Sequence, residues 1–205
     1  MTHTTARLGR LAGTLLAGTL VLAGCSGNAH TAVHGSTSPD TSASSSARQS
    51  VEHNEADASF AEQMVPHHQS AIAMAQLAPG RAADPRILDL AARIQTAQQP
   101  EIDTLTGWLA EWGAGDMSGM DHSSGDGMGG MSEQDMTALA NASGADFDRL
   151  FLEQMIRHHR AAVEMAVTES AEGQNSDALA MAGSIRDSQN AEIAEMEQLL
   201  PALGG

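Results

Sequence analysis

Apolar residues recur at helical spacing over most of the chain beyond residue 57. Positions 60, 64, 67, 71 and 74 are separated by four and three residues in turn. The same spacing returns at positions 87, 91, 94, 98, 101, 105, 108 and 112. Because residues three and four apart share one face of an α-helix, each stretch predicts a helix with one buried face.

The second half of the chain repeats the first at an offset of 91 residues. The segment 60–75 aligns with 151–166, and the segment 94–105 aligns with 185–196 without a net gap. A register kept over two segments indicates duplication of a two-helix unit. Two hairpins bury their apolar faces best against each other, so we predict an all-α fold, an antiparallel four-helix bundle made of two duplicated helical hairpins.

Capping residues and helix breakers predict the helix bounds. Side chains that accept hydrogen bonds from the first amides of a helix predict starts at Asp57, Asp84 before Pro85, Asp146 and Ser176. Breakers predict ends at Pro79-Gly80, at Gly113, near Gly173 and before Pro201. Ser132 and Asp135 predict a short extra helix. The bundle is thus expected over residues 57–205, as hairpins 57–113 and 146–200 around a Met-, His- and Gly-rich loop at 114–131.

The N-terminus has the features of an export signal. Arg7 and Arg10 precede an apolar stretch, 11–24, that is too short for an ordinary membrane-spanning helix. Leu22-Ala23-Gly24-Cys25 resembles the lipobox of bacterial lipoproteins, in which the cysteine carries the lipid. We therefore predict a signal peptide over 1–24 and an exported protein that is anchored to the outer face of the cell membrane through Cys25.

Composition narrows the function further. Residues 25–56 are rich in Ser, Thr and Ala and predict a disordered tether that carries the lipid at Cys25. Cys25 is the only cysteine, which excludes a disulfide within the mature chain. The net charge is −16, and removal of two arginines with the signal leaves 8 basic and 26 acidic residues, or −18. This charge disfavours nucleic acid and suits attraction of cations.

The predicted buried faces carry side chains that can bind metal. The first helix of each hairpin has a Met-x-x-His-His motif and a later Met on or beside the buried face: Met64, His67, His68 and Met74, then Met155, His158, His159 and Met165. The second helix of each hairpin interrupts its apolar face with an amide and a carboxylate: Gln98 and Glu101, then Gln189 and Glu192. A buried carboxylate is costly unless it is paired, and the four histidines are the obvious partners.

Two interpretations of these faces are open. In one, Glu101 and Glu192 accept hydrogen bonds from the histidine rings, and the methionines fill the core. In the other, histidine nitrogen and methionine sulfur bind a metal ion while the carboxylates orient the imidazoles. Thioether with imidazole suits Cu(I), a soft ion, better than Mg²⁺ or Ca²⁺.

The loop adds a second group of candidate ligands: Met117, Met120, Asp121, His122, Met128 and Met131. They lie among Gly and Ser, where a methionine has no core to fill. Biased low-complexity sequence is one explanation. The other is an adaptable capture site for Cu(I) or Ag(I), which would bind weakly because it is not pre-organised.

The two motifs resemble those of an exported bacterial family, catalogued as a domain of unknown function, that has a ferritin-like four-helix bundle. Its signature stands here as Met64-x-x-His67-His68-x-x-Ala71-x-x-Met74-Ala75, and again over 155–166. The resemblance covers roughly residues 57–200. Some members are associated with periplasmic copper binding and copper tolerance, so the resemblance implies copper, as Cu(I), for this chain.

Catalysis is disfavoured. Di-iron bundles use a Glu-x-x-His motif, and no Glu in this sequence has a His three positions later. The only Cys is used for lipid, and no Ser lies in a nucleophile motif. We expect a non-enzymatic copper-binding lipoprotein that buffers or stores Cu(I) or confers tolerance to it. Its expected partners are a copper-delivery protein or further copies of itself, and it should contact the membrane through its lipid only. The alternative is a metal-free interaction module of the cell envelope with a structural His/Glu layer.

Overall fold

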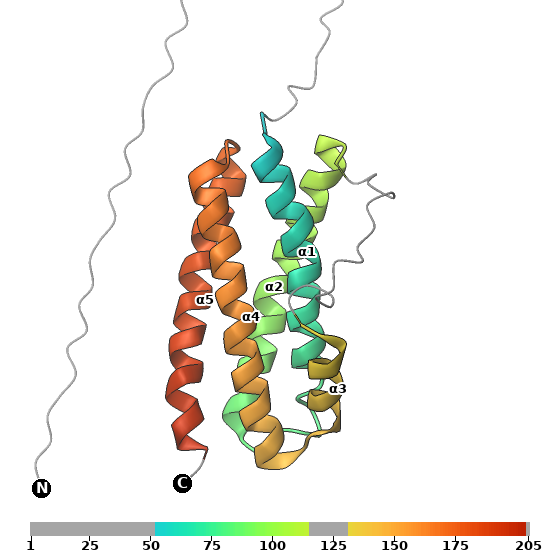
Figure 1. Cartoon of the computed structure of the whole chain (residues 1–205), viewed down its shortest axis with the longest axis vertical. Helices are drawn as coiled ribbons and strands as arrows, with labels where there is room; N and C mark the ends of the chain where they lie inside the picture. Colours follow the sequence, from blue (N-terminus) through green and yellow to red (C-terminus); the bar gives the residue numbers. More distant parts are fainter. Residues whose placement is uncertain (1–51, 115–130, 204–205) are drawn as a thin grey trace, which may run out of the picture. The chain divides into compact units, whose positions relative to one another are not determined.

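The computed structural model of the chain describes residues 52–114 and 131–203. Within these ranges the protein is all-helical, as predicted (Figure 1). The helices are α1 (Glu55–Gln76), α2 (Pro85–Trp112), α3 (Glu133–Asn141), α4 (Gly144–Glu172) and α5 (Ser176–Ala202). The predicted signal peptide, the lipidated Cys25 and the tether up to residue 51 lie outside the described residues. The described part contains no helix that is both long and apolar enough to cross a membrane.

The four long helices form an antiparallel bundle, which confirms the predicted fold. α1 packs along α2, α4 packs along α5, and α1 contacts α4 across the two hairpins. The start of α1 meets the end of α4, where the Asn54 side chain donates a hydrogen bond of 2.8 Å to the Glu172 carbonyl. Arg93 of α2 pairs with Glu195 of α5 at 2.6 Å. The short helix α3 packs on α4.

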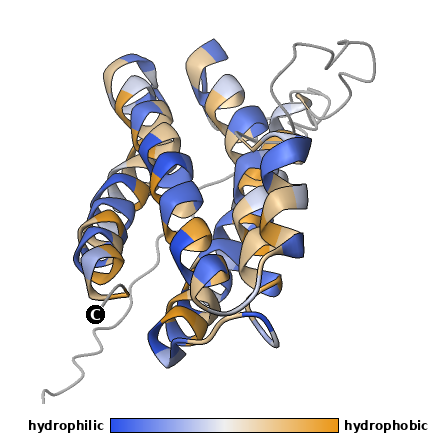
Figure 2. Cartoon of the chain, turned by 60° about the horizontal axis from the view of Figure 1, so that its bottom comes forward, coloured by the Kyte–Doolittle hydropathy of each residue, from blue (hydrophilic) through white to orange (hydrophobic). Residues whose placement is uncertain are grey.

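The buried apolar residues form two clusters, one toward each end of the bundle. The cavity-end cluster contains Phe60, Ala61, Met64, Leu105, Ala162, Ala166, Ala182 and Ile185. The α3-end cluster includes Met74, Ile94, Leu139, Phe147, Phe151, Met155 and Met196. Figure 2 shows apolar and polar residues alternating along every long helix, as expected for helices with one buried face.

Several predicted helix bounds are correct. Asp84 caps α2 with Pro85 in the first position, and Gly113 ends this helix at φ 71°. Ser132 caps α3, and Gly173 follows the last residue of α4.

Other bounds are wrong by one to three residues. Asn54 caps α1, and Asp57 is the third helical residue of a capping box. α4 begins at Gly144 instead of Asp146, and Asn175 caps α5 instead of Ser176. α1 already ends at Gln76, three residues before the predicted stop, and α5 continues through Pro201 to Ala202.

Candidate metal centre

Two histidine rings meet at the centre of the contact between α1 and α4. The ring centroids of His67 and His158 are 3.7 Å apart, and the ring planes are inclined by 37°. Both rings are buried, with His67 only 3% exposed. The two residues occupy equivalent positions of the duplicated motif, so the duplication itself brings them together.

The neighbouring histidine of each motif is held by a glutamate from the second helix of its own hairpin. His68 Nε2 and Glu101 Oε2 are 2.7 Å apart, as are His159 Nε2 and Glu192 Oε2. Since a carboxylate only accepts, Nε2 must donate, and the Nδ1 of the neutral ring then carries the lone pair. Both Nδ1 atoms are buried without a hydrogen-bond partner among the described residues. The predicted glutamate–histidine bonds are therefore present for His68 and His159.

The two glutamates are less buried than the sequence predicts. The Glu101 side chain is 22% exposed and that of Glu192 is 16% exposed, whereas the histidines that they bind are fully buried. Each carboxylate thus reaches its histidine from the solvent edge of the bundle. This geometry lowers the desolvation cost that a fully buried carboxylate would carry.

His67 is a neutral base inside the protein. Burial, and then the nearby His68 and His159, lower the pKa of His67 to about 3. Neither of its ring nitrogens has a hydrogen-bond partner within the described part of the chain. A buried polar group without a partner costs on the order of 1–3 kcal/mol, and neutral imidazole is the form that binds metals. A metal ion at His67 would recover this cost.

All four long helices contribute to one polar layer between the two apolar clusters. We use the term polar layer for His67, His68, Gln98, Glu101, His158, His159, Gln189 and Glu192. Along each helix, these residues separate the members of one cluster from those of the other. Gln98 and Gln189 are buried, and their side chains retain atoms without a partner within the described residues.

The predicted methionine ligands lie on both sides of the polar layer. Met64 belongs to the cavity-end cluster, and Met165 packs against it half-buried. Met74 and Met155 belong to the α3-end cluster. The eight motif residues are therefore brought to one region of the bundle, with the histidines in the middle and one methionine from each of α1 and α4 on either side.

The donor set fits a soft ion. Within residues 52–114 and 131–203, no three His, Cys, Asp or Glu side chains are grouped so that they could hold a metal ion by themselves. A site in the polar layer would therefore combine imidazole nitrogen with methionine sulfur. That combination favours Cu(I) over ions that prefer oxygen.

Met131 differs from the expectation that a loop methionine has no core to fill, because it is 4% exposed and packs in the α3-end cluster. It has a core to fill because α3, which directly follows it, packs against α4. The other loop candidates, Met117, Met120, Asp121, His122 and Met128, lie outside the described residues.

Three buried carboxyl groups were missed by the sequence reasoning. Asp148 Oδ2 accepts hydrogen bonds from the backbone amides of Ala83 and Asp84, at 3.2 and 2.9 Å. Asp57 accepts from the amides of Gln174 and Asn175 at the opposite end of the bundle. Asp57 and Asp148 are themselves 91 residues apart, so extending the repeat toward the N-terminus would have found them. Glu169, buried beside Asp57, has Ala78 at its equivalent position, and the repeat gives no signal for it.

These features define a class: a duplicated four-helix bundle with a central polar layer of paired histidines. The chain belongs to the family described as "Domain of unknown function (DUF305)", whose model matches residues 57–200. No curated protein matches the sequence.

Several solved structures resemble this one. CopM in the Cu(I)-bound form is 34% identical, with a TM-score of 0.60, and covers 73% of this chain and 98% of its own. The Cu(II)-bound form of CopM is 38% identical over 71% of this chain and 96% of its own, with a TM-score of 0.61. A DUF305 protein from Streptomyces coelicolor, described as a candidate secreted protein, is 29% identical over 73% of this chain and 93% of its own, with a TM-score of 0.66.

Proposed function

We propose that this protein binds copper outside the cytoplasm and holds Cu(I) with methionine sulfur and histidine nitrogen in the polar layer. The observation that carries the proposal is His67, a buried neutral imidazole without a hydrogen-bond partner among the described residues. Its ring centroid lies 3.7 Å from that of His158, between two methionine-bearing clusters. The candidate ligands are the eight motif residues, and Glu101 and Glu192 fix the ring orientation of His68 and His159.

The comparison with CopM supports the choice of ion. CopM has been solved with Cu(I), Cu(II) and silver bound. Silver resembles Cu(I) in its preference for soft ligands, so we extend the proposal to Ag(I). Copper is here the bound cargo of a buffering or storage protein, and we propose no catalytic step.

Localisation is part of the same proposal. Export is supported by the likeness to the Streptomyces coelicolor protein and by the signal-like segment 1–24. Lipidation at Cys25 would leave the bundle on the outer face of the membrane, where it could intercept copper or pass it to a delivery partner.

A metal-free interaction module is the second candidate. The observation in its favour is the pair of 2.7 Å contacts that join His68 to Glu101 and His159 to Glu192, since such bonds can specify a core without a metal. It leaves His67 unexplained, because an apolar residue at that position would pack without the cost of unpaired nitrogens.

A Cu(I) competition titration with a chromogenic chelator, under anaerobic conditions, tests the two candidates. We compare the wild type with Met64→Leu/Met155→Leu, which nearly conserves side-chain volume, and with the control Met136→Leu on α3. Loss of one thioether on each side of the layer should weaken Cu(I) binding by about ten-fold or more, while the control should bind like the wild type. A wild type that cannot compete with the chelator would favour the interaction module.

A further inference from the structure

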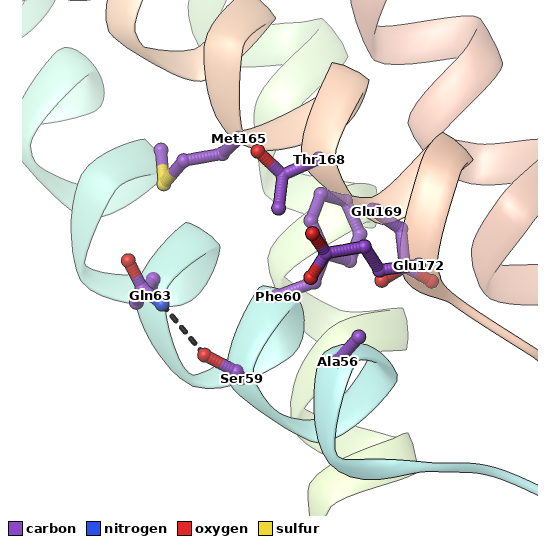
Figure 3. A pocket seen from close by; sticks show the side chains of 8 residues that line it. All are labelled: Ala56, Ser59, Phe60, Gln63, Met165, Thr168, Glu169 and Glu172. Carbon is purple, nitrogen blue, oxygen red and sulfur yellow. Dashed lines mark hydrogen bonds between the residues drawn. The ribbon is translucent and has the colours of Figure 1, made fainter.

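A cavity of about 140 Å³ opens between α1 and α4 at the end of the bundle where α1 begins. We call it the access cavity, and its lining residues are Ala56, Ser59, Phe60, Gln63, Met165, Thr168, Glu169 and Glu172 (Figure 3). Gln63, Thr168 and Glu172 are exposed, so the cavity is open to solvent, whereas Phe60 is buried at its floor.

Glu169 is the unusual member of the lining. It is 1% exposed, and the one hydrogen bond of its carboxyl group among the described residues is shared with the carboxyl group of Asp57. Figure 3 shows Glu169 among the lining residues, next to Glu172 on the same helix. Gly173 makes room for it, because a Cβ at that position would lie 2.3 Å from Glu169 Oε1. A buried carboxyl group that lines a cavity and whose hydrogen-bond partner is a second carboxyl group indicates a place for a cation, which would relieve the repulsion between the two when both are ionised.

The duplication supplies an internal comparison, because the equivalent positions at the other end of the bundle hold apolar residues. The positions equivalent to Ala56, Thr168 and Glu169 hold Phe147, Leu77 and Ala78. These three residues pack in or against the α3-end cluster. The same backbone can therefore close this place with apolar side chains, and the carboxyl group at position 169 is not shared by the equivalent position of the other repeat.

Charge at this end favours a cation. The segments 52–63 and 168–178 contain seven acidic residues and no Arg or Lys: Glu52, Glu55, Asp57, Glu62, Glu169, Glu172 and Asp177. A surface of one sign raises the local concentration of oppositely charged ions and speeds their association. Because burial and the neighbouring Asp57 raise the pKa of Glu169 to about 8, a cation that enters at neutral pH would replace its proton.

Met165 links the access cavity to the cluster that borders the candidate metal centre. Met165 lines the cavity and packs against the cluster that contains Met64. Met64 in turn lies three residues before His67, one helical turn away on the same face. The ligand character thus changes from carboxyl oxygen in the cavity to methionine sulfur and imidazole nitrogen in the interior, both of which suit a soft ion better than oxygen does.

We propose that the access cavity is the uptake site of the protein: Cu(I) binds there transiently at Glu169 and passes by Met165 to Met64 and the polar layer. The inference rests on the proposed function, and it adds the path by which Cu(I) would reach the polar layer. The ion changes ligands along this route but not its oxidation state. Oxygen is a poor ligand for Cu(I), so the cavity releases the ion inward and does not trap it.

The test is a stopped-flow measurement of Cu(I) uptake by the full protein from a Cu(I)–chelator complex, in the concentration range where the wild-type rate rises linearly with protein. Ala56→Phe/Glu169→Ala gives this end the residues that the other repeat already accommodates. We expect its uptake rate to fall by about ten-fold, because the cavity is filled and its acceptor is lost. Glu169→Gln, which keeps the shape of the side chain, should slow uptake in the same direction.

The control is Asp103→Asn, which removes one exposed charge from α2 and should leave the rate unchanged. The equilibrium titration provides the second readout. A variant that only blocks the route should change the rates of Cu(I) uptake and release by the same factor, and its occupancy at equilibrium should equal that of the wild type. Uptake by Ala56→Phe/Glu169→Ala at the wild-type rate overturns the uptake site alone. A wild type that takes up no Cu(I) overturns the proposed function, and the uptake site with it.

Discussion

Asp57 and Glu169 are neighbouring buried carboxyl groups with opposite protonation. Burial alone would raise the pKa of Asp57, but hydrogen bonds from the backbone amides of Asn54, Asn175 and Gln174 and from the side chain of Glu169 more than offset it and lower the pKa. Glu169 accepts no such backbone hydrogen bonds among the described residues, and burial, followed by the hydrogen bond with Asp57 and the charge of Asp57, raises its pKa to about 8. At neutral pH Asp57 is therefore ionised, while Glu169 is mostly protonated.

This raised pKa makes stability depend on pH. Between about pH 4.5 and 8, the folded protein binds a proton at Glu169 that the unfolded chain does not. The contribution of Glu169 to the free energy of unfolding is therefore fully present below pH 4.5 and is lost as pH rises to about 8. Glu169→Gln should remove this loss, which is on the order of a few kcal/mol. Urea unfolding at pH 5, 6, 7 and 8.5 measures it.

The comparison for this experiment is Glu172→Gln, one turn further along α4 and exposed. It should keep the pH dependence of the wild type. If Glu169→Gln and the wild type lose stability in parallel between pH 5 and 8.5, Glu169 is not the group that titrates.

At the scale of the helices, one aspartate of each hairpin accepts hydrogen bonds from backbone amides of the other hairpin. Asp148 near the start of α4 binds the amides that precede α2, and Asp57 near the start of α1 binds the amides that precede α5. Each carboxylate satisfies backbone donors that the adjacent helix start leaves without partners. The hairpins are thereby held in register with each other, which keeps His67 opposite His158.

Asp148→Ala should therefore destabilise the bundle more than the loss of an ordinary helix cap. It leaves two backbone donors without their charged acceptor, and we expect a loss of about 2–4 kcal/mol in the free energy of unfolding at pH 7. Asp84→Ala, which removes the half-buried cap of α2, should cost about 1 kcal/mol. Equal losses for the two variants in urea unfolding would show that Asp148 is no more than a local cap.

The helix bounds show which part of the fold the sequence could predict. Helical spacing and the repeat predict all four long helices and their pairing, because both signals are carried by many residues. Single caps are less certain, since Asp57 and Asp146 look like caps at the start of a periodic stretch. Asp57 is instead tied to residues 174 and 175, and a contact over that sequence separation cannot be inferred from local pattern.

For the candidate site, the sequence predicts the positions of the histidines but not all of their bonds. The repeat and the helical spacing place His67, His68 and their equivalents in the core, and the structure brings them together there. The spacing could not show that only His68 and His159 are bonded to the glutamates, because that choice depends on how each ring turns between neighbouring helices. The access cavity gave no signal either, since it arises from small and polar residues where the other repeat has large apolar ones.

For the molecule as a whole, the duplication gives a symmetric centre with two different ends. The polar layer is shared equally by the two repeats. One end is closed by α3, where Met131 and Leu139 complete the α3-end cluster. The other end carries the access cavity and the acidic segments, with His53 stacked on Trp112 at a centroid distance of 4.7 Å. The proposed uptake of copper therefore involves one end of the bundle, and most of the large apolar core residues lie toward the other.

The segment between α2 and α3 joins these two ends. Trp112 lies at the cavity end and Met131 at the α3 end, so deleting residues 116–130 would break a connection that spans the bundle. Replacement of Met117, Met120, His122 and Met128 by serine keeps the length of the segment and removes its soft ligands.

We expect this serine variant to bind fewer Cu(I) ions at saturation, measured by equilibrium dialysis with metal analysis. The affinity of the bundle should be unchanged, because the four residues are not among the eight of the polar layer. Met131→Leu, a core substitution of similar volume, should leave the capacity as it was. If the serine variant binds as many ions as the wild type, the segment holds no copper, and all binding belongs to the bundle.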